Sequence, residues 1–144
     1  MKRIEFTIPV EPRTKKNSQQ IMMSGRGRRY IAQSNTYMRY VAETGYLLKE
    51  VKRDNDIKEP ITEPVHVKAT FFRSTRKIVD LTNLQECLHD VLVGADILSD
   101  DSCRIIVSTD GSRVRYDKSN PRTEVVIEPI ISWEDMRERE RMIP

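Results

Sequence analysis

The segment VDLTNLQECLHDVLVGADILSDD, residues 79–101, decides how the rest of the chain is interpreted. Leucine and valine recur in it at the three- and four-residue spacing of a helix with one apolar face, and Gly94 is a suitable place for that helix to end. Acidic residues stand before, within and after the apolar pattern. They are Asp80, Glu86, Asp90, Asp100 and Asp101. The segment therefore predicts an amphipathic helix that carries more negative charge than packing alone requires.

Two interpretations of these acids stay open from the residues alone. With Asp80 at the helix start, Glu86 and Asp90 lie on one face, where no positive partner offsets their charge. Mg²⁺ is bound through one or two carboxylates together with water and phosphate oxygens, so Asp80, a helix acid and one acid of the pair after the helix would form an adequate site. In the other interpretation Asp80 only caps the helix, the later pair only makes a turn, and the helix acids only keep a surface hydrated.

Length and composition favour a single folded domain. A chain of 144 residues can bury a core without disulfides or a structural metal, and Cys87 and Cys103 have no second cysteine pair that would complete a zinc site. No run approaches the roughly 18 apolar residues of a membrane span. The start leads into the strand-like IEFTIPV and has no signal-peptide core, so we expect a cytoplasmic protein.

The remaining periodicity predicts one small α+β (mixed α/β) domain, residues 1–130, with the order β-α-β-α-β-β. Strands are expected at 4–10, 65–71, 104–109 and 122–128, and a first helix should begin at Ser34 or Asn35. Residues 11–34 lack a sustained period and are expected to form a long functional loop, and residues 110–121 a turn. The charged tail, residues 131–144, is either a short exposed helix or a docking segment.

Positive charge is concentrated in the N-terminal quarter. The whole chain has a net charge of only +3, but residues 1–40 hold nine basic residues against two acids, a local excess of seven. A basic region beside an acidic helix is the layout expected when one part of a protein binds phosphates and another holds a cation.

The order of motifs makes the chain recognisable. Asp80-Leu81-Thr82-Asn83-Leu84 is followed by Asp90, then by Leu92, and then by Asp100-Asp101 before a strand. This pattern resembles the core motif of the RusA family of Holliday junction resolvases. The opening strand, its proline-containing turn and the lysines that follow are similar to the start of that family. The resemblance covers residues 4–128 and leaves the tail outside.

The resemblance implies a Mg²⁺-dependent endodeoxyribonuclease, with Mn²⁺ as a substitute ion, that resolves Holliday junctions or other branched DNA by paired symmetric cuts. It also implies a homodimer in a bacterial cytoplasm, where the gene could belong to a prophage. No membrane partner or small-molecule cofactor is expected. Matched position by position, Asp80 and Asp101 are the expected catalytic and metal-binding residues, with Asp100 beside them.

This chain departs from the family pattern at two positions, where it has Thr82 in place of an aspartate and Glu86 in place of a lysine. Glu86 lies one helical turn from Thr82 and could restore the missing carboxylate, so we count it among the catalytic and metal-binding residues. Lys15 or Lys16 would then replace the lost lysine. Otherwise the chain binds branched DNA without cutting it.

Contacts to DNA phosphates are expected from the basic residues of the 11–34 loop and of the segment before Asp80. These residues are Lys15, Lys16, Arg26, Arg28, Arg29, Arg76 and Lys77. Tyr30 is a candidate for stacking on an unpaired base, whereas Tyr37 and Tyr40 are assigned to the core or to a dimer contact.

Overall fold

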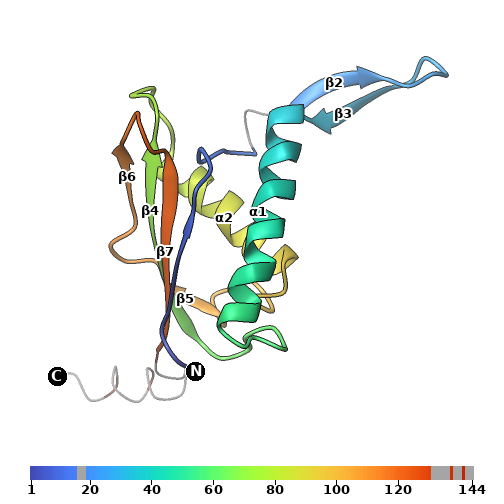
Figure 1. Cartoon of the computed structure of the whole chain (residues 1–144). Helices are drawn as coiled ribbons and strands as arrows, with labels where there is room; N and C mark the ends of the chain where they lie inside the picture. The colour runs from blue at the N-terminus through green and yellow to red at the C-terminus, as the bar shows by residue number, and fades with distance from the viewer. Residues whose placement is uncertain (16–18, 131–136, 138–140, 142–144) are drawn as a thin grey trace.

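The computed structural model of the chain describes residues 1–15, 19–130, 137 and 141, and Figure 1 shows how its elements are arranged. In chain order these are β1 (Ile4–Ile8), β2 (Gln19–Met23), β3 (Arg29–Gln33), α1 (Asn35–Asp54), β4 (Val65–Arg73), α2 (Leu81–Gly94), β5 (Ile106–Ser108), β6 (Arg113–Tyr116) and β7 (Arg122–Pro129). The predicted α+β class is confirmed. Both predicted helices and all four predicted strands are present, with somewhat different ends.

The main sheet is built around β4. β1 pairs antiparallel with β7, and β7 pairs antiparallel with β4. The other edge of β4 carries two short parallel strands, β5 at its first residues and β6 at its last four. The end of β4 that leads toward α2 is therefore flanked by β6.

The core lies between this sheet and the two helices, which cover the same face of it (Figure 1). Along β4 the side chains of Val65, Val67, Ala69 and Phe71 are buried, in the alternation of a strand with one covered face. The leucines of α2 complete the layer: Leu84, Leu88 and Leu92 are at most 1% exposed. This apolar face fixes the rotation of α2 and leaves its acids on other faces.

The start of α1 follows the sequence prediction. Ser34 is the N-cap, and its hydroxyl accepts a hydrogen bond of 3.2 Å from the backbone N–H of Tyr37. Lys52 and Arg53 stand in the last turn, where positive charge is favourable to the helix dipole.

Three strands were not predicted. Residues 11–34 do not form one irregular loop, because β2 and β3 pair as an antiparallel hairpin. Its turn is closed by hydrogen bonds from Ser24 N to Arg28 O (2.8 Å) and from Gly27 N to Ser24 O (2.9 Å), with Gly27 at φ +75. β6 lies within the segment expected to be a turn, and all four of its residues are exposed. No side chain that the structure describes in β2, β3 or β6 is buried, so these strands lack the alternation from which strands are predicted.

Nothing in the described residues tests the expected tail, because 131–136, 138–140 and 142–144 lie outside them. Among the helices that the structure describes, none is long and apolar enough to cross a bilayer.

Candidate active site

Asp80 stands at the start of α2 as its N-cap residue, yet its carboxylate does not cap the helix. The side chain makes no hydrogen bond to the backbone N–H groups of the first turn and instead accepts one of 3.2 Å from Asn83 Nδ2. Because the side chain is exposed, its other lone pairs face solvent. A residue whose only role was capping would direct its carboxylate at the helix amides, so this geometry favours a separate use of the Asp80 carboxylate.

A second group of charges surrounds the middle of α2. Partial burial raises the pKa of Asp90 above its ordinary value, Lys15 opposes this rise, and Asp101 and Glu86 add to it. The charges of Lys15, Asp101 and Glu86 are thus each within electrostatic reach of the Asp90 carboxylate. With a rise of about 1.5 Å per residue, Asp90 lies about 15 Å along the helix axis from Asp80. Asp80 and Asp90 are therefore too far apart to bind the same metal ion directly.

His89 lies beside Asp101 at this second group. Burial lowers the pKa of His89, and the negative charge of Asp101 partly opposes that effect. The imidazole is therefore neutral at neutral pH and adds no positive charge to the acids around it.

Asp100 is engaged within its own turn. A hydrogen bond from the Ser102 hydroxyl and, with a smaller effect, one from the backbone N–H of Asp101 hold the pKa of the Asp100 carboxyl below its ordinary value. These contacts are those of a turn-forming aspartate, so Asp100 is held as an anion whether or not it also contributes to a reaction.

Tyr37 of α1 lies near Cys87, Asp90 and Glu86 of α2, a contact that the sequence did not predict. Burial raises its pKa to about 12, with Cys87 as the next cause and the charges of Asp90 and Glu86 as smaller ones. Burial also raises the pKa of Cys87 to about 11. Both groups keep their protons at neutral pH, and they form the contact through which α1 supports the acidic face of α2.

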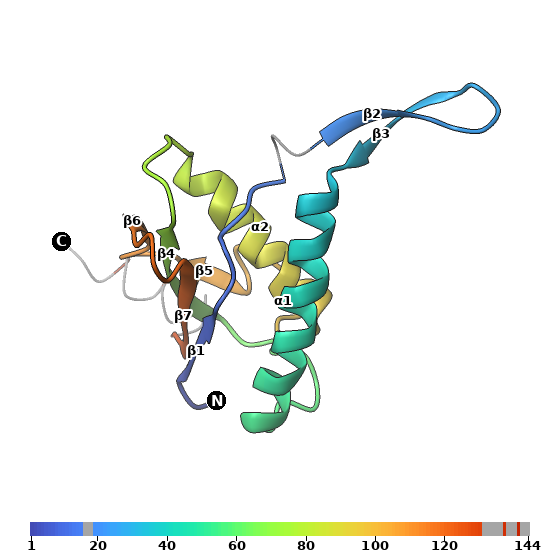
Figure 2. The ribbon, with the colours of Figure 1, turned by 45° about the horizontal axis from the view of Figure 1, so that its top comes forward.

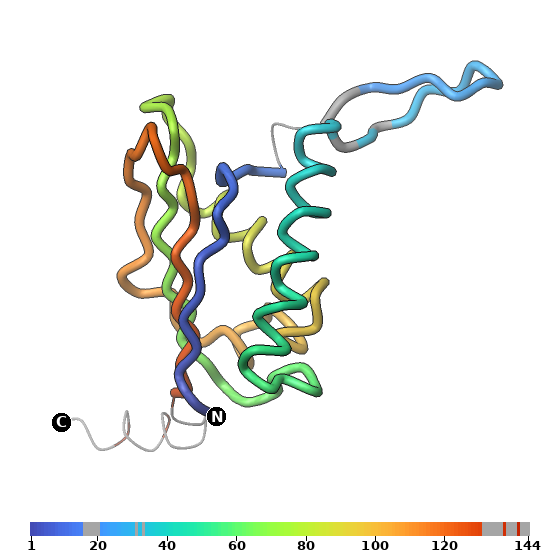
Figure 3. The backbone as a smooth tube through the Cα atoms, viewed as in Figure 1, coloured from blue at the N-terminus to red at the C-terminus, as the bar shows by residue number. Residues whose placement is uncertain are grey.

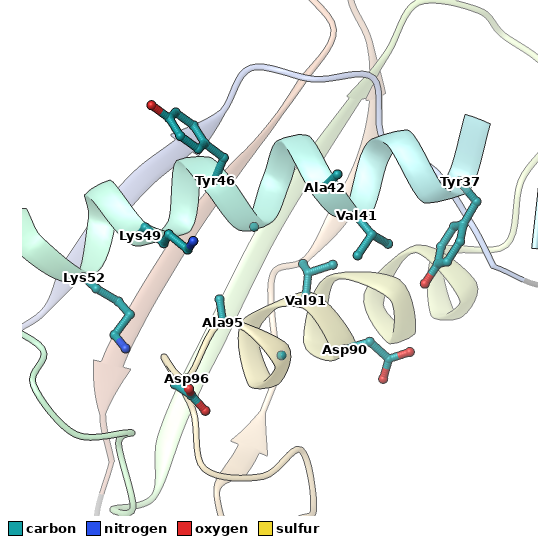
Figure 4. A pocket seen from close by; sticks show the side chains of 12 residues that line it. Tyr37, Val41, Ala42, Tyr46, Lys49, Lys52, Asp90, Val91, Ala95 and Asp96 are labelled. Atoms are coloured by element: carbon teal, nitrogen blue, oxygen red, sulfur yellow. The ribbon is translucent and has the colours of Figure 1, made fainter. Parts of the chain in front are cut away.

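An open pocket of about 550 Å³ lies between α1 and α2. Figure 4 shows Tyr37 and Asp90 at one end of it and Lys52 and Asp96 at the other, with small or apolar side chains between them. Only Asp90 belongs both to this pocket and to the acidic group. The pocket therefore borders the candidate site and does not contain it.

The segment before Asp80 that carries Arg76 and Lys77 contacts the ends of β6 and β4. The guanidinium of Arg76 stacks on the Tyr116 ring, 4.1 Å from its centroid, and the carbonyl of Lys77 accepts a hydrogen bond of 2.8 Å from Arg73 Nη1. β6 also carries two exposed arginines that were not among the predicted DNA contacts, Arg113 and Arg115. The sequence placed both arginines in the segment expected to be a turn, where no pattern distinguished them.

The N-terminal segment is tied to the same region through Glu11. Its carboxylate accepts hydrogen bonds from the backbone N–H of Ser74 (3.2 and 3.3 Å) and from the Ser74 hydroxyl (3.0 Å). Ser74 directly follows β4, and Lys15 follows Glu11 by four residues. This contact connects the segment that carries Lys15 with the segment that leads to Asp80.

The other predicted DNA contacts lie farther away. Arg26, Arg28 and Arg29 are exposed at the turn of the β2–β3 hairpin, which extends from the body of the protein as Figure 3 shows. Lys16 is outside the described residues. The predicted basic residues thus form two sets, one beside the acids and one on the hairpin.

The carboxylates have the donor chemistry of a Mg²⁺ site but do not complete one by themselves. In the part of the chain that the structure describes, no three acidic, histidine or cysteine side chains converge closely enough to hold one metal ion. Mg²⁺ commonly uses one or two carboxylates and takes its other ligands from water and substrate phosphates. The residues present therefore fit an ion whose coordination is completed by bound DNA.

Comparison with known proteins places these residues in one family. The chain matches the family described as Endodeoxyribonuclease RusA over residues 9–128, a range that contains every acid discussed above. Among curated proteins, none matches the chain.

Proposed function

The chain belongs to the RusA endodeoxyribonuclease family, whose members resolve Holliday junctions, and on this premise we propose that it cuts branched DNA by Mg²⁺-dependent, paired and symmetric phosphodiester hydrolysis. The observation that carries the proposal is the Asp80 carboxylate, which is exposed at the start of α2 and makes no capping hydrogen bond. An exposed carboxylate that does not cap its helix and stands beside basic residues is suited to a metal ion that also binds a DNA phosphate.

In this proposal Asp80 and Asp101 are the principal metal ligands, and Asp100 supports Asp101 from the preceding position. Bound Mg²⁺ would polarise the scissile phosphate and lower the pKa of the attacking water. Arg76 is restrained by its stacking on Tyr116 and would orient the DNA strand that enters the site. Lys77 would add a further phosphate contact.

Glu86 is proposed to supply the carboxylate that position 82 lacks. It is exposed, lies one turn from Thr82, and contributes negative charge at Asp90. Lys15 acts on the same carboxylate in the opposite sense, because its positive charge lowers the pKa of Asp90 whereas Glu86 raises it. This supports the exchange in which Glu86 replaces an acid and Lys15 replaces the lysine of the family pattern.

The active form is proposed to be a homodimer. A four-way junction offers two equivalent strands, and a twofold protein presents one site to each of them. Light scattering of the purified chain tests this directly, since a mass of one chain at the concentrations used for cleavage would contradict it.

A second function is favoured by a specific observation, the absence of a close three-acid cluster among the described residues together with Thr82 at a family aspartate. Under this alternative the protein binds branched DNA and does not cut it. The two functions differ in only one measurable respect, which is cleavage in the presence of a divalent ion.

The experiment that separates them uses a labelled synthetic four-way junction with Mg²⁺ or Mn²⁺. Native protein should give paired symmetric nicks, while Asp80→Asn should bind the junction and leave it intact. Asp110→Asn is the matched control, because Asp110 is also exposed but lies in the turn before β6. Tight binding without nicks from the native protein under either ion would establish the alternative.

A further inference from the structure

The hairpin of β2 and β3, here called the arm (residues 19–33), stands apart from the rest of the described protein. β2 and β3 pair with each other and with no other described strand, and Figures 1 and 2 show the arm extending beyond the start of α1. A two-stranded hairpin without a core is marginally stable in water on its own. The arm therefore has the structure of an element that is completed by a partner.

Apolar side chains on the arm are unusually exposed. Ile21 is 74% exposed, Met23 is 64% and Tyr30 is 49%. Met22 lies opposite Tyr30 in the register, so these two side chains share one face, while Ile21 and Met23 point to the other. An element that is apolar on both faces is suited to insertion between two surfaces rather than to docking on one.

The charge of this region identifies the kind of partner. From residue 12 to residue 42 the chain has no acidic residue, and every charged side chain in that stretch is basic. Two of the basic residues, Arg26 and Arg28, lie in the turn of the arm, and Arg29 begins β3. This distribution of charge favours a polyanion as the partner of the arm. A hairpin that only covered another protein surface would not need an excess of positive charge.

We propose that the arm inserts at the branch point of a DNA junction. Its arginines contact phosphates around the branch, and the pair of Met22 and Tyr30 stacks on bases that are not covered by a neighbouring base pair. This inference rests on the proposed function, because it assumes that branched DNA is the substrate. A two-stranded β-ribbon fits a DNA groove, and methionine and aromatic side chains are known to pack against opened base steps.

Different side chains of the arm should set its affinity for DNA and its selectivity for branched over linear DNA. Phosphate contacts act on any DNA and depend strongly on salt, whereas stacking requires a base with a free face. The arginines should therefore raise affinity for linear and branched DNA alike. Met22 and Tyr30 should raise affinity only for branched DNA.

The test compares the dissociation constants of a four-way junction and of a linear duplex of the same sequence, without divalent ions so that no strand is cut. For Met22→Ser/Tyr30→Ser we expect about a tenfold loss of junction affinity, the size typical of one lost stacking contact, and a duplex affinity within twofold of native. Replacing Arg26, Arg28 and Arg29 by glutamine should instead weaken both complexes. It should also reduce the slope of log K against log salt by about one for each lost phosphate contact.

Two further variants keep the test decisive. Met38→Ser/Tyr46→Ser changes the same residue types at sites on α1 that are 57% and 69% exposed, and both affinities should stay native. Tyr30→Phe keeps the ring and should keep the preference for junctions, which assigns the effect to the ring rather than to the hydroxyl. A duplex affinity of the arm's serine pair that stays within twofold of native shows that the arginines of the arm still bind.

Three outcomes would overturn the inference. The serine pair on the arm could leave junction preference unchanged, or it could weaken junction and duplex equally. It could also convert a dimer to a monomer in light scattering, which would assign the arm to the second copy of the chain. In each case a native protein that still prefers and cuts junctions would leave the proposed function standing, whereas native protein without that preference would remove both.

Discussion

Replacing Glu11 by alanine should measurably destabilise the fold, although Glu11 belongs to no helix or strand. Its carboxylate accepts three hydrogen-bond contacts of 3.0 to 3.3 Å from Ser74, which lies 63 residues later in the chain. The change would leave the backbone N–H of Ser74 without this partner at a partly buried position. The segment after β1 would then lose its polar contact with the segment after β4.

The expected cost is about 2 kcal/mol, because a hydrogen bond to a charged group contributes about 1.5 to 3 kcal/mol and water can reach part of this site. With a urea dependence of about 2 kcal/mol per molar for a protein of this size, the unfolding midpoint should fall by about 1 M. A domain with a stability of about 5 to 15 kcal/mol stays folded at 25 °C after such a loss, so the assay is equilibrium unfolding in urea.

Glu5→Ala is the matched control. Glu5 is paired with Arg3 at 3.0 Å, but both side chains are more than half exposed, and such surface pairs contribute less than about 1 kcal/mol. A double-mutant cycle of Glu11→Ala with Ser74→Ala should give a coupling of about 1 kcal/mol. The reasoning is refuted if Glu11→Ala shifts the midpoint no more than Glu5→Ala, or if the two changes in the cycle are additive.

Three further predictions concern α2 and the two thiols. Leu88 is fully buried, so Leu88→Ala should cost about 3 to 4 kcal/mol in urea unfolding, and a loss below about 1 kcal/mol would show that this face does not form the core. Native protein should react rapidly with Ellman's reagent at one thiol per chain, the exposed Cys103, because Cys87 is buried and its pKa is raised to about 11; two rapid thiols would contradict this. The pKa of Asp90 is raised in the folded state, so its ionisation opposes folding as the pH rises through that pKa. Asp90→Asn should therefore raise the urea midpoint more at pH 7 than at pH 4, and an equal or larger gain at pH 4 would refute the assigned cause.

The elements predicted correctly are those with one side in the core. β4 alternates and α2 carries leucines at helical spacing because each buries a single face, and burial is what gives a sequence its period. β6 is wholly exposed and the arm has apolar residues on both faces, so neither left a recognisable pattern. Their pairing depends on backbone hydrogen bonds and on the turn at Gly27 rather than on a core.

The candidate site was predictable only in part. The acids of α2 are near one another in sequence, so their arrangement follows from helix geometry. The approach of Lys15 to Asp90 joins residues 75 positions apart, and the position of Tyr37 beside them depends on how α1 packs on α2. Contacts of this kind are set by the tertiary fold and have no local signal.

Whether the chain keeps a working site without a carboxylate at position 82 is measured most directly by the single-turnover rate at which it cuts a four-way junction with Mg²⁺. We predict cleavage by the native protein, a rate lower by about 10- to 100-fold for Glu86→Gln, the loss typical of a weakened metal site, and recovery in Thr82→Asp/Glu86→Gln. Cleavage by Glu86→Gln at the native rate would contradict the role given to Glu86. Native protein that binds the junction and never cuts it would contradict the proposed activity itself.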